Sequence, residues 1–217
     1  MSIVENINKI NNEISETATL VAVSKTKPNE SIHEAYDFGQ RIFGENKVQE
    51  LVQKYEELPK DIEWHLIGHL QTNKVKFIAP FISLIHAVDS FKLLKEINKQ
   101  AIKNNRIINC LLQVKIAEEE SKFGLTKNEV EDIINSEEIK EFKGINIAGL
   151  MGMATNSSDK DQVKEEFNSL NNFFTQLKTQ HPTLNILSMG MSGDYKIAIE
   201  QGSNMIRVGS TIFGGRL

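Results

Sequence analysis

The stretch NILSMGMSGDYKIAIEQGSNMIRV, residues 185–208, contains a complete strand–helix–strand unit. Its two ends, residues 185–189 and 204–208, are short apolar runs of the kind found in strands that are covered on both faces. Between them, Asp194 is placed to begin a helix over YKIAIEQ, and Gly202 is placed to end it in a left-handed conformation. The stretch therefore predicts two parallel strands that are joined by a helix.

The same alternation extends back through the rest of the chain. The capping boxes Ser31-x-x-Glu34 and Thr126-x-x-Glu129 predict the starts of two further helices, and apolar residues spaced three or four apart over residues 159–180 predict a long amphipathic one. The apolar runs predicted as strands are residues 19–24, 41–44, 63–68, 84–88, 107–116, 145–151, 185–189 and 204–208.

Eight strand–helix units predict an α/β protein that is a single (β/α)8 TIM barrel. An additional N-terminal helix would close the bottom of the barrel or pack on its outside. An open, doubly wound sheet is the alternative, but such sheets more often have fewer strands. We expect residues 1–217 to form one domain, because α/β barrels run past about 200 residues and no Pro-, Gly- or Ser-rich linker divides this chain.

The composition is that of a soluble globular protein, with 40% hydrophobic and 25% charged residues. The net charge of −4 argues against the broad basic surface that binds nucleic acids. The one cysteine, Cys110, cannot form an internal disulfide, which is typical of a reducing compartment. No apolar run approaches the roughly 18 residues of a membrane span, and the polar N-terminus is not typical of a signal or transit peptide. We therefore expect a cytoplasmic protein with neither nucleic-acid nor membrane partners.

In barrels of this type, functional side chains follow the carboxyl ends of the strands. Lys25 follows the first apolar run, and burial of such a lysine favours the neutral amine that forms Schiff bases with carbonyl compounds. A solvated lysine without a chemical role is the other interpretation of Lys25.

Small residues follow the last two strands, at Ser188, Ser192, Gly209 and Ser210. Barrels frequently bind phosphate at these two loops, through backbone N–H groups and hydroxyls. Tight turns would use the same residue types. The chain lacks the G-x-x-x-x-G-K-[ST] pattern of a P-loop, so nucleotide hydrolysis is not expected.

Arg207 lies inside the last apolar run, where a charged side chain must find a partner. The partner is either a carboxylate of the barrel or a ligand at the barrel mouth.

Other features are interpreted as structural. His65 and His69 are four residues apart, but this spacing crosses from a strand into a loop, so we expect no shared metal ion and no metal site. Cys110 lies in an apolar run and is predicted to be inert core. The Met-Gly-Met segments at residues 151–153 and 189–191 are predicted to pack in the barrel.

Six segments resemble, in order, motifs of the pyridoxal phosphate (PLP) homeostasis protein family. They are VAVSKTKP, FGENKVQE, WHLIGHLQTNK, GLMGMAT, LSMGMSGDYKIAI and IRVGSTIFG, and the resemblance extends from Leu20 to Arg216. Members of this family are fold-type III PLP-binding barrels related to the N-terminal domain of alanine racemase.

The resemblance implies roles for particular residues. Lys25 would hold PLP as a Schiff base, Asn46 would lie near its phenolic oxygen, and Arg207 would face its pyridine nitrogen. Lys27 and Lys122 match basic positions near the site. The phosphate-binding positions of the family match Ser188, Ser192, Gly209 and Ser210.

The resemblance also bears on function. An arginine stays protonated, so it keeps a nearby pyridine nitrogen unprotonated and makes PLP a weaker electron sink. Racemases of this fold compensate with a second base, a tyrosine from a second domain, and we expect neither in this chain. The sequence departs from the family pattern at its end, where many relatives continue with a short basic tail, so the resemblance does not carry over any role of that tail, for example in cofactor release.

We therefore expect a PLP-binding protein, a monomer or weak dimer, that holds PLP on Lys25 and supplies it to apo-enzymes. This interpretation assigns no catalytic residues. The alternatives are a weak amino-acid racemase or other PLP-dependent enzyme, and a sugar-phosphate enzyme with Lys25 as its Schiff-base lysine.

Overall fold

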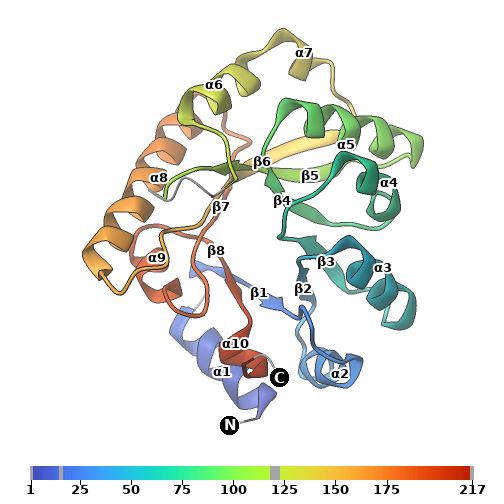
Figure 1. The fold of residues 1–217 in the computed structure, drawn as a ribbon, viewed down its shortest axis with the longest axis vertical. Helices are drawn as coiled ribbons and strands as arrows, with labels where there is room; N and C mark the ends of the chain where they lie inside the picture. The colour runs from blue at the N-terminus through green and yellow to red at the C-terminus, as the bar shows by residue number, and fades with distance from the viewer. Residues whose placement is uncertain (1, 15–16, 118–122, 216–217) are drawn as a thin grey trace.

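The structure is a computed structural model that describes residues 2–14, 17–117 and 123–215. Eight parallel strands form a closed barrel in chain order, and β8 pairs with β1 to close it (Figure 1). The predicted barrel and all its strands are confirmed, with differences of one or two residues at their ends. The strands are β1 Thr19–Val23, β2 Ile42–Glu45, β3 Glu63–Leu66, β4 Leu84–Val88, β5 Ile108–Val114, β6 Ile145–Gly152, β7 Ile186–Ser188 and β8 Met205–Val208.

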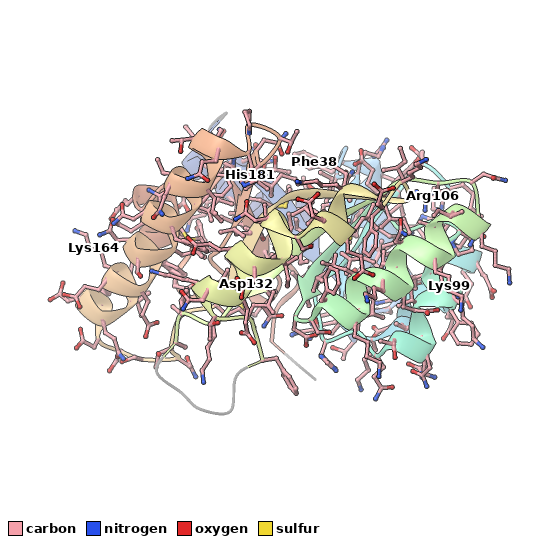
Figure 2. All side chains as sticks on the ribbon, turned by 90° about the horizontal axis from the view of Figure 1, so that it is seen from above. Phe38, Lys99, Arg106, Asp132, Lys164 and His181 are labelled. Carbon is pink, nitrogen blue, oxygen red and sulfur yellow. The ribbon has the colours of Figure 1, made fainter. Side chains whose placement is uncertain are left out.

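Helices surround the barrel, and charged side chains such as Lys99, Asp132 and Lys164 project from their outer faces (Figure 2). Among the helices of the described residues, none combines the length and the apolar character that a membrane crossing needs. The helices are α1 Ile3–Ile14, α2 Asn29–Asp37, α3 Val48–Glu57, the 3-10 turn η2 Thr72–Lys74, α4 Val75–Ile78, α5 Phe91–Lys103, α6 Lys127–Asn135, α7 Glu137–Lys140, α8 Lys160–Gln180, α9 Tyr195–Glu200 and α10 Ser210–Phe213.

The N-terminal helix α1 packs on the outside of the barrel, which is the second of the two predicted placements. Its Asn6 side chain donates to the carbonyl of Ile212 at 3.0 Å, next to the chain's last helix. Its Glu13 accepts a hydrogen bond from Tyr195 and pairs with Lys196 at 3.1 Å. Helix α1 therefore covers the barrel beside α9 and α10.

One of the two predicted capping boxes is confirmed, and the other is wrong. Thr126 and Glu129 form the predicted capping box of α6. Helix α2 instead begins two residues before Ser31, at Asn29, because Pro28 is already in an extended conformation that directs the chain into the helix. The Ser31 N–H donates to the carbonyl of Pro28, so Ser31 belongs to the first turn and is not a cap.

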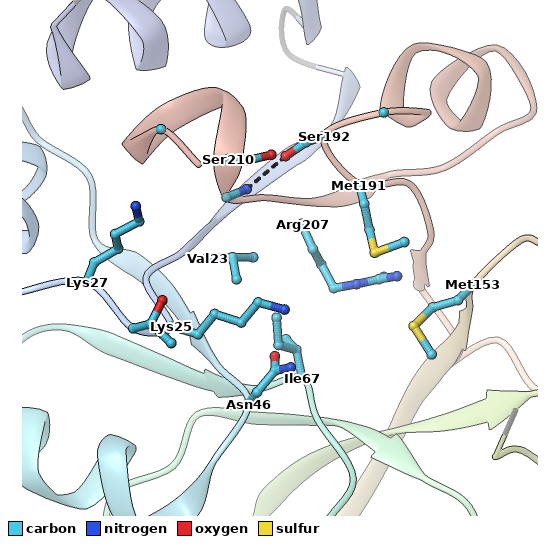
Figure 3. Close-up of a pocket in the computed structure, with 14 residues that line it drawn as sticks. Val23, Lys25, Lys27, Asn46, Ile67, Met153, Met191, Ser192, Arg207 and Ser210 are labelled. Carbon is cyan, nitrogen blue, oxygen red and sulfur yellow. Dashed lines mark hydrogen bonds between the residues drawn. The ribbon is translucent and has the colours of Figure 1, made fainter. Parts of the chain in front are cut away.

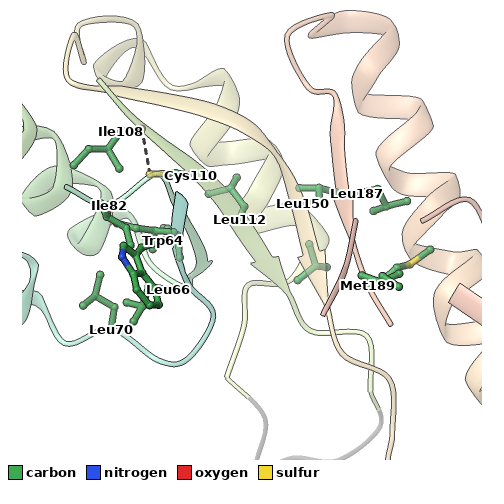
Figure 4. Close-up of a cluster of buried hydrophobic side chains, with 14 of the residues drawn as sticks. Trp64, Leu66, Leu70, Ile82, Ile108, Cys110, Leu112, Leu150, Leu187 and Met189 are labelled. Atoms are coloured by element: carbon green, nitrogen blue, oxygen red, sulfur yellow. Dashed lines mark hydrogen bonds between the residues drawn. The ribbon is translucent and has the colours of Figure 1, made fainter. Parts of the chain in front are cut away.

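Hydrophobic side chains form two layers. The outer layer lies between the strands and the helices, and Figure 4 shows part of it around Trp64 and Cys110. The inner layer fills the barrel with residues such as Val21 and Leu111. Some polar side chains are buried as well. Those that come from barrel strands include His65, His86, Gln113, Ser188 and Arg207.

Candidate functional site

A cavity of about 350 Å³ opens at the carboxyl ends of the strands (Figure 3). Such cavities are the usual location of ligand sites in barrels. Six of the seven site residues proposed from the sequence line it, and these are Lys25, Asn46, Ser192, Arg207, Gly209 and Ser210. The seventh, Ser188, is buried and is not part of the lining.

Lys25 and Asn46 are brought together by the pairing of β1 with β2. Val23 is aligned with Gly44, and Lys25 and Asn46 each come two positions after their own member of this aligned pair. Figure 3 shows the Lys25 side chain extending into the cavity toward Asn46. Gly68 allows this arrangement, because a Cβ at that position would lie 2.4 Å from the Asn46 carbonyl oxygen.

The loops after β7 and β8 meet at Ser192. Its hydroxyl accepts from the backbone N–H of Gly209 at 3.2 Å and from that of Thr211 at 3.5 Å. A Cβ at Gly209 would lie 3.1 Å from the Val23 carbonyl oxygen, so the small residue lets this loop approach β1 closely. Small polar groups are thus gathered at one end of the cavity. The adjacent Lys27 ammonium donates to the Gly215 carbonyl at 2.8 Å, whereas Lys122 lies outside the described residues.

Arg207 projects from β8 into the cavity with only 3% of its surface exposed. Its guanidinium donates to the Ser188 hydroxyl at 2.6 Å and to the Gly152 carbonyl at 3.1 Å. Within the part of the chain that the structure describes, no carboxylate lies at ion-pair distance from Arg207, although the charge of Asp194 interacts with it at longer range. Burial lowers the pKa of Arg207 to about 10, which still leaves it protonated at neutral pH.

Ser188 connects Arg207 to two histidines that sequence reasoning did not assign to the site. The Ser188 hydroxyl lies 3.0 Å from Nδ1 of His86, and Nε2 of His86 lies 3.0 Å from Nδ1 of His65. All four side chains are buried. The available signal was the same as for Arg207, a polar residue inside an apolar strand.

The charge states limit the directions that these hydrogen bonds can take. Burial lowers the pKa of His65 to about 3 and that of His86 well below its ordinary value, so both imidazoles are neutral. Ser188 accepts from Arg207 and keeps one donor and one further lone pair for Nδ1 of His86. With its proton on Nε2, His86 accepts from Ser188 and donates to His65, and with its proton on Nδ1 it donates to Ser188 and accepts from His65. In both tautomers an unbroken chain of hydrogen bonds runs from Arg207 across the barrel interior to β3.

This burial predicts a loss of stability in acid that His65→Asn reduces. The unfolded state takes up a proton at position 65 below pH 6.5 and the folded state only near pH 3, so stability falls as the pH falls through this window. At pH 5 the difference amounts to about 2 kcal/mol, and asparagine offers both a donor and an acceptor to His86 without titrating. The measurement is the free energy of unfolding in urea at pH 7 and pH 5. An equal loss of unfolding free energy in the wild type and in His65→Asn would contradict the assignment of His65 as a neutral buried imidazole.

Several residues interpreted as structural now have defined positions. His65 is buried, whereas His69 is exposed. The His69 ring stacks on Phe123, and its Nδ1 lies 2.9 Å from Oδ2 of Asp89. Cys110 is core as predicted, and burial raises the pKa of its thiol.

The methionines divide differently from the prediction. Met151 and Met189 are buried, as expected. Met153 and Met191 instead line the cavity and form an apolar wall beside Arg207 (Figure 3).

Comparison with known proteins places this fold and cavity in a family. The family model for the alanine racemase N-terminal domain matches residues 1–217. The pyridoxal phosphate homeostasis protein of Vibrio alginolyticus is 41% identical over 206 residues, covering 93% of this chain and 88% of the relative. The Escherichia coli K12 protein of the same name is 38% identical over 205 residues, covering 93% and 87%.

Solved structures support the same family assignment. The structure of PipY from Synechococcus elongatus PCC7942 with PLP bound has a TM-score of 0.90 and 33% identity, and covers 98% of this chain and 100% of that one. An alanine racemase of Clostridium difficile 630 shares the fold, with a TM-score of 0.82 at 15% identity, and this chain spans 60% of it. The chain belongs to the alanine racemase N-terminal domain family and, within it, to the pyridoxal phosphate homeostasis proteins.

Proposed function

We propose that the protein binds PLP in this cavity and supplies it to apo-enzymes, as a homeostasis protein acting through a single domain over residues 1–217. The observation that carries the proposal is that one cavity combines the Lys25 amine with the buried guanidinium of Arg207, which forms no ion pair at close range among the described residues. A cationic group of this kind is stabilised by an anionic or hydrogen-bond-accepting ligand. The names of the curated relatives and the PLP in PipY support this choice of ligand.

The cavity residues fit a flat aromatic ring with polar ends. Val23, Ile67, Met153 and Met191 supply apolar walls, and Lys25, Asn46, Arg207, Ser192 and Ser210 supply polar groups. PLP carries an aldehyde that condenses with a primary amine to a coloured Schiff base. Lys25 is the residue that would hold this group, with Asn46 near its phenolic oxygen and Arg207 near its ring nitrogen. Ser192, Gly209 and Ser210 would bind the phosphate.

Ser188 is proposed for a different role from the one first expected. Its side chain is buried, and its hydroxyl is engaged by Arg207 and His86. We therefore propose that Ser188 supports Arg207 and does not bind phosphate.

Binding is favoured over catalysis because no tyrosine, the second base of racemases of this fold, lines the cavity. The three tyrosines are engaged elsewhere: Tyr36 with Asp61, Tyr195 with Glu13, and Tyr55 stacked on Phe81. None of them lines the cavity. A weak amino-acid racemase is the second candidate, favoured by the shared fold and the position of Lys25. We place the protein in the cytoplasm as a monomer or weak dimer, in keeping with its single buried Cys110.

The test is a titration of the purified protein with PLP, followed by transfer to an apo-enzyme that depends on PLP. We expect a visible absorbance band that saturates at one equivalent, and recovery of the acceptor's activity when the loaded protein is added. A protein that stays colourless contradicts PLP binding. Inversion of an L-amino acid by the pure, loaded protein would favour the racemase instead.

A further inference from the structure

A buried charge cluster lies directly behind the strand end that carries Lys25. Its centre is Lys54 of α3, which is 5% exposed. The Lys54 ammonium donates to the Ser24 carbonyl at 2.8 Å, to Oε1 of Glu45 at 2.7 Å and to Oε1 of Glu50 at 2.7 Å. These three bonds use every N–H that a lysine ammonium carries. Lys54 is therefore held in one position, and so are the groups it contacts.

The cluster holds the backbone on both sides of Lys25. The Ser24 carbonyl belongs to the peptide group that precedes Lys25, and it accepts from Lys54. The Thr26 N–H belongs to the peptide group that follows Lys25, and it donates to Oε1 of Glu50 at 2.5 Å. Both flanking peptide groups are thus bound by side chains one helical turn apart on α3.

The backbone held in this way is strained. Thr26 has a φ of 62°, a left-handed conformation that β-branched residues rarely adopt. Such a conformation persists only when its surroundings hold it, and the bond to Glu50 is one such restraint. The Ser24 hydroxyl adds a second restraint, because it donates to Oε1 of Glu45 at 2.6 Å.

We infer that Lys54 and Glu50 are positioning residues that fix the backbone at Lys25 so that its amine points into the cavity. Neither residue is needed to contact the ligand, and both act through Ser24 and Thr26. The inference rests on the proposed function, because it concerns how Lys25 is presented to PLP.

The test compares Lys54→Met and Glu50→Ala with wild type by the rate at which the visible band forms on mixing with PLP. Misdirection of the reacting amine is expected to slow this step on the order of tenfold to 100-fold. The pH at which the band titrates is expected to shift, because the Lys25 amine loses its fixed surroundings. Lys95→Met is the matched control, since it removes an exposed ion pair with Glu138 and should behave as wild type.

Thr26→Gly provides a rescue, because glycine adopts positive φ without strain. In the double variant with Glu50→Ala, Thr26→Gly is expected to recover part of the lost rate of band formation. Such a recovery would not be explained if Glu50→Ala acted only by lowering the overall stability. If Lys54→Met does not fold, the test rests on Glu50→Ala, because Glu50 is only half-buried. A wild-type rate and pH profile in Glu50→Ala would overturn the inference. A colourless wild type would instead reject PLP binding itself, so the two failures are distinguishable.

Discussion

Lys25→Ala is expected to abolish the visible band that the wild-type protein forms with PLP. Lys25 lines the cavity from the end of β1, and a Schiff base requires a primary amine at that position. The variant should also give no PLP-labelled peptide after reduction with borohydride, whereas wild type should carry the label on Lys25. Absorbance titration and peptide mass spectrometry measure the two outcomes.

Lys27→Ala is the matched control for this prediction. Lys27 is another lysine in the cavity lining, and its ammonium donates to the Gly215 carbonyl at 2.8 Å. Because its own position already provides a partner, we expect Lys27→Ala to keep the band. The assignment of Lys25 is wrong if Lys25→Ala still forms the band or if the label appears on Lys27.

The fold could be predicted largely because parallel barrel strands are buried on both faces and therefore appear as continuous apolar runs. Helix starts were less certain, because they depend on local backbone geometry. Ser31 and Glu34 have the spacing of a capping box, but Pro28 ends the extended segment earlier and the helix begins before them. At Asp194 the position was correct, yet its carboxylate accepts from the Met191 N–H in the loop and makes no capping bond to α9.

The candidate site could be predicted where a residue follows its own strand, since that rule needs only local sequence. Contacts between distant strands could not be derived in this way. His86 and Ser188 are 102 positions apart and meet only inside the closed barrel. Lys54 and Glu45 are nine positions apart, and only the packing of α3 on β2 buries their contact. Burial then determines which of these groups remain charged, and burial is a property of the whole fold.

Arg207→Met is the second large effect that we expect, and it separates binding from stability. The Arg207 guanidinium is buried with polar partners but without a carboxylate at ion-pair distance among the described residues, so its desolvation is only partly offset in the unliganded protein. Methionine fills a similar volume and removes this cost, while Ser188 and Gly152 each lose a donor. The free energy of unfolding without PLP is therefore expected to change little or to rise.

The affinity for PLP should move in the opposite direction. A hydrogen bond from a charged donor contributes about 1.5–3 kcal/mol, so its loss should weaken PLP binding by roughly 10-fold to 150-fold. Arg106→Met is the control, because Arg106 also donates to a buried backbone carbonyl, that of Ala79 at 2.9 Å, but does not line the cavity. Its PLP affinity should equal that of wild type. An Arg207→Met protein that is much less stable yet binds PLP normally would mean that Arg207 serves the barrel core, and that the ligand does not meet its charge.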